Sequence, residues 1–474
     1  MRKISIFMLL FLLLFNMPVS ATANVLDSSV TENLGSSNVS VSLRSLSTGH
    51  VLYEHGGNTL MKPASTLKLL TGATALSVLG NDFKFTTKLY IDGEIENDVL
   101  YGDVYIEGSG DPTLQKGDFI TFAKVLKRKG IRTINGHIYG DDSLFTGSHL
   151  TPGIVKDDET EYYAARTTAL TMSPNEDYDA GTIIINVTGT TAGKAPIFTA
   201  LPNASGMKIV NKARTVSRGA QNTVTVKRNY GTNTVVIAGN IPQGSTVKEW
   251  VTLNDPTINT LHAIKDTWLS AGIRFSTTSN LKRHKTPNTA KLLYTKQSMP
   301  LDKLYPIFMK LSNNSIADIL VKTIGKKERG IGNTESGLVV MRDYAKTIGL
   351  DVTKWRFEDG SGMSHNNKVS ANELTSLLFI MQQQPVYNNF YNSLPIGGQK
   401  DRFVGGSLRK RFDTAELRNR VVAKTGSLTQ VYTLAGYVTA NSGRKYAFSI
   451  MVENKSPAAI NGIDRVVESI IKNY

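Results

Sequence analysis

Residues 62–72, KPASTLKLLTG, place Ser65 at the start of an apolar helix and Lys68 one turn further along the same face. Positions i and i+3 of a helix are neighbours, so the two side chains are expected to meet. Free N–H groups in a first helical turn can stabilise an oxyanion. A serine becomes an effective nucleophile beside a base, and a lysine is a base only if burial or a second cation lowers its pKa. A capping serine beside a solvated lysine is the alternative.

The N-terminal segment has the three regions of a secretory signal peptide. Two basic residues precede an apolar run over residues 4–15, and the small-residue triplet ATA follows at 21–23. A transmembrane anchor is the alternative, but the run is shorter than the roughly 20 residues that a span needs. We therefore expect residues 1–23 to be a signal peptide and the mature chain, beginning near Asn24, to be exported without a transmembrane anchor.

Composition limits the classes of site and partner. The 474 residues, 40% of them hydrophobic, are enough for more than one domain. The absence of cysteine excludes disulfides, thiolate nucleophiles and zinc–thiolate or iron–sulfur sites. A formal charge of +15 suits an anionic surrounding such as cell-wall polymers. The basic clusters LKRHK (281–285) and RKRF (409–412) lack any nucleic-acid motif, so no nucleic-acid partner is expected.

Both ends of the chain predict strands and helices of one domain. Residues 38–55 alternate apolar and polar side chains around a turn, which indicates a hairpin with one face buried. Residues 431–438 and 446–453 are two further strands, followed by a C-terminal helix with apolar residues at helical spacing. The middle, from about 85 to 288, has short alternating runs between Gly, Asn, Asp and Pro, with one helix in 257–273. We expect one sheet built from both termini and a mostly β insertion.

Two further motifs accompany Ser65-x-x-Lys68. Ser312-Asn313-Asn314 is an S-x-N triplet, and Lys424-Thr425-Gly426 opens a predicted strand. Each is weak alone, but the order S-x-x-K, S-x-N, K-T-G resembles the penicillin-recognising serine acyltransferases.

The long sequence between Ser65 and Ser312 points to one family within this class. A large insertion at this place resembles that of the class C low-molecular-mass penicillin-binding proteins, the D-alanyl-D-alanine carboxypeptidase/endopeptidase family. Further landmarks of that family are GSGDPTL (108–114), GDDSLF (140–145), DGSGMS (359–364) and GGSLRKRF (405–412). The resemblance covers nearly the whole mature chain.

The resemblance implies an α/β penicillin-binding (serine β-lactamase-like) domain with an antiparallel sheet flanked by helices. Together with the change in sequence pattern between the ends and the middle of the chain, the resemblance assigns residues 24–85 and 289–474 to this catalytic domain. Residues 86–165 and 250–288 form an insertion domain II, and 166–249 an insertion domain III, both rich in β-structure.

The resemblance also implies roles. Ser65 attacks the carbonyl between the two D-alanines of a peptidoglycan stem peptide, and neutral Lys68 takes its proton, with a pKa lowered by burial and by Lys424. Ser312 relays the proton to the departing amine. Asn314 binds the substrate amide and helps to position Lys68.

The K-T-G segment and one departure complete the implied site. Lys424, Thr425, Gly426 and Ser427 bind the terminal carboxylate, and the backbone N–H groups of Ser65 and Ser427 form the oxyanion hole. His365 stands where the family usually has an arginine, near the pocket for the end of the stem-peptide side chain. No metal or cofactor is expected, and β-lactams should acylate the same serine.

Three alternatives remain open from the sequence. An endopeptidase that cleaves D-alanyl cross-links uses the same residues and differs in the leaving group. A β-lactamase needs a dedicated deacylating carboxylate soon after S-x-N, and no E-x-x-L-N follows there. A wall-binding scaffold with a non-functional site would use the β-rich insertion and the positive charge.

Overall fold

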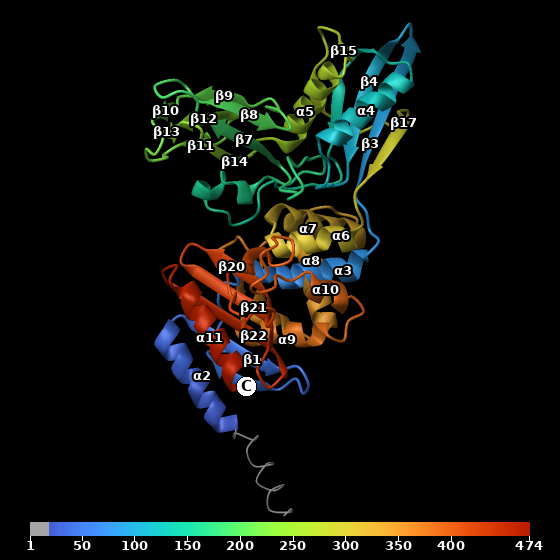
Figure 1. Cartoon of the computed structure of the whole chain (residues 1–474). Helices are drawn as coiled ribbons and strands as arrows, with labels where there is room; N and C mark the ends of the chain where they lie inside the picture. Colours follow the sequence, from blue (N-terminus) through green and yellow to red (C-terminus); the bar gives the residue numbers. More distant parts are fainter. Residues whose placement is uncertain (1–18) are drawn as a thin grey trace, which may run out of the picture.

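The computed structural model describes residues 19–474, and Figure 1 shows its two ends joined in one layered domain with the insertion beside it. The charged and apolar regions of the predicted signal peptide lie outside the described residues. The ATA triplet falls within helix α2 (Val19–Leu34). Among the described helices, none is long and apolar enough to cross a bilayer.

A five-stranded antiparallel sheet is the centre of the catalytic part. Its order is β2 (Val51–His55), β1 (Val39–Ser45), β22 (Lys445–Glu453), β21 (Val431–Thr439) and β20 (Val421–Leu428). Val41 of β1 lies opposite Ile450 of β22, so the first and last strands of the chain are direct neighbours. The prediction of one sheet from both termini is confirmed.

Helices cover both faces of this sheet. One face packs on α2 and α11 (Ala459–Asn473). Six helices lie on the other side: α3 (Lys68–Leu79), α6 (Leu301–Leu311), α7 (Asn314–Arg329), α8 (Thr334–Thr347), α9 (Ala371–Met381) and α10 (Tyr387–Asn392). The expectation that the first hairpin buries one face is therefore wrong for β1, whose Ser40 and Ser42 are also fully buried. The hydroxyl of Ser42 forms a 3.0 Å hydrogen bond with that of Thr375 on α9, which satisfies it.

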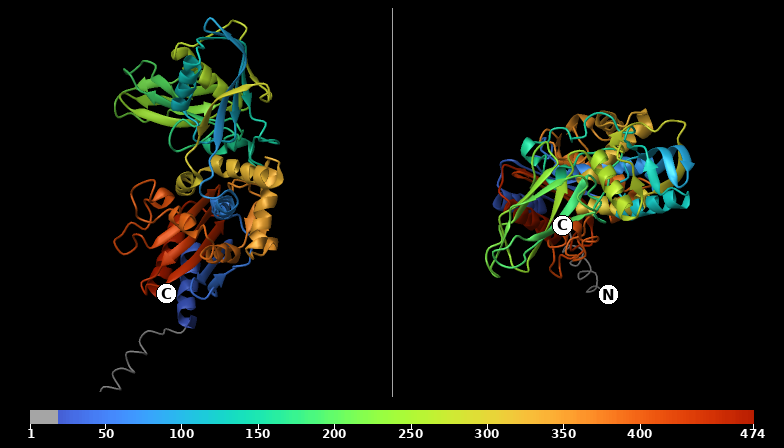
Figure 2. Two further views of the ribbon diagram at one scale, coloured as in Figure 1. Left: turned by 90° about the vertical axis from the view of Figure 1, so that its right-hand side faces the viewer. Right: turned by 90° about the horizontal axis from the view of Figure 1, so that it is seen from above.

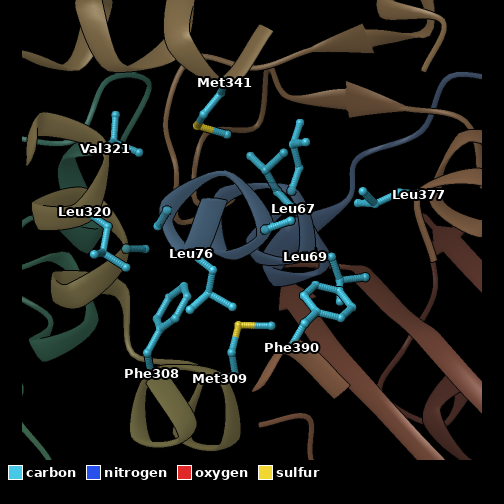
Figure 3. Packing of buried hydrophobic residues seen from close by; sticks show 14 of the residues in the cluster. Leu67, Leu69, Leu76, Phe308, Met309, Leu320, Val321, Met341, Leu377 and Phe390 are labelled. Carbon is cyan, nitrogen blue, oxygen red and sulfur yellow. The ribbon is translucent and has the colours of Figure 1, made fainter. Parts of the chain in front are cut away.

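Helix α3 is surrounded by its neighbours, as Figure 3 shows. Leu69 and Leu76 belong to an apolar cluster with side chains from five other helices: Phe308, Met309, Leu320, Val321, Met341, Leu377 and Phe390. A close-packed helix cannot shift without opening cavities. The first residue of α3, Lys68, is consequently held in a fixed place.

The insertion contains two groups of strands (Figure 2). The first is a sheet of β15 (Arg274–Phe275), β5 (Thr133–Asn135), β4 (Val99–Gly108), β3 (Thr86–Glu96) and β17 (Lys291–Gln297), extended by β6 (Ile138–Asp141) and β16 (Leu281–Arg283) and packed with α4 (Lys116–Arg128) and α5 (Pro256–Ser270). The second comprises β14 (Thr246–Thr252), β7 (Thr182–Thr188), β8 (Ile197–Leu201), β11 (Thr225–Arg228), β12 (Thr234–Ala238), β9 (Lys208–Asn211), β10 (Arg214–Val216) and β13 (Asn240–Pro242). One continuous apolar cluster contains side chains of both groups.

Two boundaries of the insertion differ from the sequence-based ones. β17 pairs with β3, so the catalytic part resumes after residue 297 rather than at 289. β14 pairs with β7, so residues 250–252 belong with the second group of strands. The insertion also has a second helix, α4, whose buried Phe119, Phe122 and Leu126 lie at helical spacing. With these changes we propose the same division into a catalytic domain and two insertion domains.

Candidate active site

Ser65 lies in a single 3-10 turn, Ala64–Leu67, that leads directly into α3. The residue before it, Ala64, has a positive φ of 46°, a strained conformation for a side chain with Cβ. Ser65 itself is half-buried. The nucleophile candidate therefore stands on a tight turn whose geometry is fixed by the packed helix behind it.

Lys68 is fully buried and its Nζ contacts three oxygens. The distances are 3.0 Å to Oγ of Ser65, 2.6 Å to Oδ1 of Asn314 and 2.5 Å to the carbonyl oxygen of Ser361. A neutral amine has two N–H donors and one lone pair. In the ammonium form Nζ donates to all three oxygens; in the neutral form, with both N–H groups donated to Asn314 and Ser361, the lone pair faces the hydroxyl of Ser65.

Burial lowers the pKa of Lys68 to about 8 because the charged form loses its hydration. Two buried carboxyls, Asp318 and Asp359, oppose this shift because they stabilise the ammonium form. Burial also lowers the pKa of Lys424 far below its usual value, and the charge of Lys68 adds to that effect. The repulsion between the two ammonium groups is mutual, so the charged form of either lysine disfavours the charged form of the other.

The S-x-N motif forms the junction between α6 and α7. Ser312 ends α6 in a left-handed conformation with φ 59°, and the Asn313 side chain caps α7 by accepting from the N–H of Ile316. Asn313 Nδ2 also donates to the backbone oxygen of Asp177 in the insertion. This junction aims Ser312 and Asn314 into the site while its middle residue binds the insertion.

Strand β20 carries the K-T-G segment along the opposite wall. Nζ of Lys424 donates to Oγ of Ser312 over 2.7 Å and to the backbone oxygen of Thr425 over 2.8 Å. The Thr425 hydroxyl donates to Oγ of Ser407 over 2.7 Å. Ser427 is exposed at the end of the strand. Lys424 is fully buried. Its two hydrogen bonds therefore link Ser312 to the strand within the protein interior.

Two glycines allow backbone to approach Ser65 closely. A Cβ on Gly426 would lie 2.9 Å from the backbone nitrogen of Ser65 and 2.2 Å from Oγ1 of Thr433. A Cβ on Gly362, which has φ 87°, would lie 2.0 Å from the backbone oxygen of Ala64. Side chains at these positions would push β20 and the 359–364 loop away from the nucleophile.

The active site opens into a cavity of about 620 Å³. Ser65, Ser312, Asn314, the 425–427 segment and His365 are among the residues that line it. Three residues of the insertion also line it: Asp158, Tyr162 and Tyr163. The structure therefore brings the predicted residues together, with Lys68 and Lys424 buried beneath the surface of the cavity.

Sequence reasoning missed the insertion loop and the buried carboxyls. Asn314 Nδ2 donates to the backbone oxygen of Tyr163, and no sequence pattern around Tyr163 signals this contact. Asp359 accepts backbone N–H groups from Gly362 and Ser364 and so shapes the loop that presents Ser361. Asp359 is the first residue of the landmark DGSGMS (359–364), so that motif could have indicated its importance.

Ser65 lies next to the buried Lys68 at the start of a helix. That helix packs beside an antiparallel sheet whose edge strand carries a second buried lysine, Lys424. This arrangement defines a serine acyl-transfer enzyme of the penicillin-binding class. The particular family follows from the sequence match: residues 21–473 match the D-Ala-D-Ala carboxypeptidase 3 (S13) family, and the chain belongs to that family.

Named relatives and solved structures agree. The chain is 33% identical over 430 residues to the D-alanyl-D-alanine carboxypeptidase of Actinomadura sp. (strain R39), covering 90% of this chain and 80% of that one. It is 26% identical over 445 residues to the D-alanyl-D-alanine carboxypeptidase DacB of Haemophilus influenzae, covering 92% and 89%. The crystal structure of penicillin binding protein 4 (dacB) from that organism superposes with a TM-score of 0.79 at 23% identity, covering 96% and 100%. The predicted serine β-lactamase-like fold with β-rich insertions is confirmed.

Proposed function

We propose that the chain is an exported serine D-alanyl-D-alanine carboxypeptidase that cleaves peptidoglycan stem peptides through an acyl-enzyme on Ser65. The observation that carries the proposal is the buried amine of Lys68, which lies 3.0 Å from Oγ of Ser65. Its two other contacts are to acceptors, Oδ1 of Asn314 and the backbone oxygen of Ser361. A base with a pKa of about 8 is partly neutral near physiological pH.

Acylation begins when Lys68 accepts the proton of Ser65 and Oγ attacks the carbonyl carbon of the penultimate D-alanine. The resulting oxyanion is stabilised by the backbone N–H groups of Ser65 and Ser427, and Gly426, the neighbour of Ser427, lets β20 approach the backbone nitrogen of Ser65. The C–N bond breaks, and the departing amine takes a proton delivered through Ser312 from Lys68.

The terminal carboxylate of the substrate is bound by Lys424, Thr425 and Ser427. Burial lowers the pKa of Lys424, and a bound carboxylate opposes that shift because it stabilises the ammonium form through a medium of low polarity. The Asn314 amide contacts the substrate backbone while its oxygen holds Lys68. Water then attacks the ester, its hydroxyl joins the acyl carbon, and Ser65 regains its proton.

A β-lactam presents a strained amide to the same serine, so we expect it to acylate Ser65 and to leave a slowly hydrolysed ester. Penicillin binding protein 4 (dacB) from Haemophilus influenzae, which has the same fold, has been solved in complex with a β-lactam. The substrate side chain extends past His365, which replaces an arginine in the family's usual pattern, and we propose that His365 modifies the preference for that side chain.

Export and wall association belong to the same proposal. The N-terminal signal-peptide pattern accounts for export, and the charge of +15 for attachment to anionic wall polymers. Wall binding that persists in about 1 M salt, where the Debye length is near 3 Å, contradicts an electrostatic attachment.

The deciding experiment is the intact mass of the protein after incubation with benzylpenicillin, followed by peptide mapping. We expect one adduct on Ser65, its loss in Ser65→Ala, and release of D-alanine from a pentapeptide by the wild type. A folded wild type that forms no adduct and releases no D-alanine contradicts the proposal and favours the scaffold. Rapid penicillin turnover without an adduct favours a β-lactamase.

A further inference from the structure

The second group of strands in the insertion is charged with one sign only. Between Asp179 and Glu249 the sequence contains no aspartate or glutamate, whereas it contains eight lysines and arginines. Three of the eight have an acidic or aromatic partner: Arg228, Lys227 and Lys248. The other five are exposed and, within the described residues, form no ion pair, side-chain hydrogen bond or cation–π contact: Lys194, Lys208, Lys212, Arg214 and Arg218.

Three of these five cations lie along one extended segment that includes β9 and β10. The N–H groups of Lys208, Lys212 and Arg214 donate to successive backbone oxygens of the parallel segment 233–239. Residues an even number of positions apart in an extended segment have their side chains on the same face. The three cationic side chains therefore form a row on one face.

The remaining two cations lie next to this row. The N–H of Thr215 donates to the backbone oxygen of Lys194 over 2.8 Å, so Lys194 lies beside Arg214. Arg218 follows the end of β10 by two residues. We call the five side chains the cationic ridge. In Figure 1, β9 and β10 lie on the side of the insertion that is remote from the catalytic part, whereas β14 lies toward it. A large partner can therefore bind the cationic ridge without entering the active-site cavity.

A row of unpaired cations without carboxylates suits a linear polyanion. Alternate residues of a strand are about 6.6 Å apart. Consecutive phosphates of a polyol phosphate chain are joined through six covalent bonds, which span a similar distance when extended. Residues 208–218 contain no aromatic side chain and expose no apolar one. The row thus lacks the rings that stack on nucleic-acid bases and the apolar side chains that enter a lipid surface.

The position of the row at a sheet edge has a second explanation. Within the described residues, β9 and β10 each pair with a single strand, so both are edge strands. Lysine on an edge strand discourages pairing between two copies of a chain. Edge protection accounts for cations on these strands, but it does not require the absence of every carboxylate from the whole group of strands.

We propose that the cationic ridge is the docking surface for a linear cell-wall polymer of phosphodiester-linked polyols. The inference rests on the wall association in the proposed function, and it assigns that association to one surface rather than to the charge of the whole chain. The ridge side chains donate charge-assisted hydrogen bonds to the phosphates. A polymer bound there tethers the enzyme to the wall while the active-site cavity stays open to stem peptides.

The test measures binding of the full-length mature protein to purified poly(glycerol phosphate) at several salt concentrations. Five phosphate contacts on a flexible chain predict that the logarithm of the binding constant falls with that of the salt concentration with a slope of about −3 to −4. The triple variant Lys208→Gln, Lys212→Gln, Arg214→Gln should bind at least about 10-fold more weakly at 0.1 M salt. Its slope should be smaller in magnitude by about 2.

A matched control removes the same three charges elsewhere in the insertion. Lys124, Arg128 and Lys129 are exposed at the end of α4 in the first group of strands. Their simultaneous replacement by glutamine should leave polymer binding within about twofold of the wild type. Equal losses in the two triple variants mean that net charge alone acts, and no loss in the ridge variant means that the polymer binds elsewhere; either result overturns the inference. Tighter binding of the wild type to anionic phospholipid vesicles or to single-stranded DNA than to the polymer also overturns it.

Activity measurements separate this inference from the proposed function. Benzylpenicillin acylation and D-alanine release should be equal in the ridge variant and the wild type, because no ridge residue lines the active-site cavity. If the triple variant melts early, the double variant Lys194→Gln, Arg218→Gln repeats the comparison outside the paired part of the segment. A wild type that acylates but does not bind the polymer overturns the docking surface while the carboxypeptidase proposal stands. A wild type without acylation contradicts the proposed function itself.

Discussion

The hydroxyl of Thr151 donates a 2.6 Å hydrogen bond to Oδ2 of Asp318, which joins the insertion to the helix that carries Asn314. Asp318 lies one turn after Asn314, and both it and Lys68 are buried. Burial raises the pKa of Asp318 to about 7, whereas the bond from Thr151 lowers it. The insertion thus contacts a carboxyl that acts electrostatically on the proposed catalytic base.

The first prediction concerns the pH dependence of acylation. Since the reaction needs neutral Lys68, the second-order rate with benzylpenicillin should rise with pH to a plateau, with a midpoint near the pKa of about 8. The Asp318 carboxylate raises the pKa of Lys68, so Asp318→Asn should move the midpoint to lower pH. Thr151→Val should shift it in the same direction by less, because Asp318 is then less ionised. A midpoint that stays fixed or rises in Asp318→Asn contradicts this coupling.

Neighbouring residues of the S-x-N motif should fail in different ways. Asn314→Ala removes an acceptor of Lys68, so we expect benzylpenicillin acylation to slow by about 10²-fold with little change in melting temperature. Asn313→Ala removes the cap of α7 and contacts to the insertion, so it should destabilise the protein by about 0.5–2 kcal/mol or more and affect acylation less. Stopped-flow acylation and thermal melts of both variants check the contrast. The reverse pattern would show that Asn314 has only a structural role.

A buried ion pair should anchor the insertion loop that contributes Asp158, Tyr162 and Tyr163 to the cavity lining. Oε1 of Glu159 accepts from Arg228 over 2.7 Å and from Arg166 over 3.1 Å, and both Glu159 and Arg228 are buried. Glu159→Gln leaves the charge of Arg228 uncompensated, which should destabilise the insertion by about 3–5 kcal/mol. The melting transition should fall accordingly.

The exposed pair Lys227–Glu161, at 3.7 Å in the same region, provides the control for the buried pair. Glu161→Gln should change stability by at most about 1 kcal/mol. Equal effects of the two substitutions in differential scanning calorimetry contradict an anchoring role for the buried pair.

The motif residues were predictable because their positions depend on local structure. The apolar pattern after Ser65 indicates a helix, and Lys424 lies on a strand as predicted, although β20 begins at Val421 and the K-T-G motif does not open it. Both C-terminal strands also lie where the sequence places them. The local sequence therefore located two of the three motifs on the correct elements.

The contacts between the insertion and the catalytic part were not predictable from such patterns. Thr151 and Asp318 are far apart in the chain, and so are Tyr163 and Asn314, so tertiary packing alone brings them together. The same limit explains the boundary at 289, because the pairing of β17 with β3 is a tertiary contact that the sequence of β17 does not encode. The buried Ser40 and Ser42 follow from helices on both faces of the sheet, which the hairpin sequence does not encode.

The last prediction separates a close contact from backbone strain at two glycines with positive φ. Gly362 (φ 87°) and Gly330 (φ 74°) both adopt a conformation that disfavours alanine by about 1–2 kcal/mol. A Cβ on Gly330 meets no atom within 4 Å, whereas one on Gly362 would lie 2.0 Å from the backbone oxygen of Ala64.

We therefore expect Gly330→Ala to lower the melting temperature slightly and to acylate normally. Gly362→Ala should lower it further and slow benzylpenicillin acylation at least about 10-fold, because the turn that carries Ser65 must move relative to Lys68 and a small displacement of reacting groups slows catalysis strongly. Thermal melts and acylation rates of the two variants check this. Equal acylation by both variants means that the 359–364 loop does not position the nucleophile.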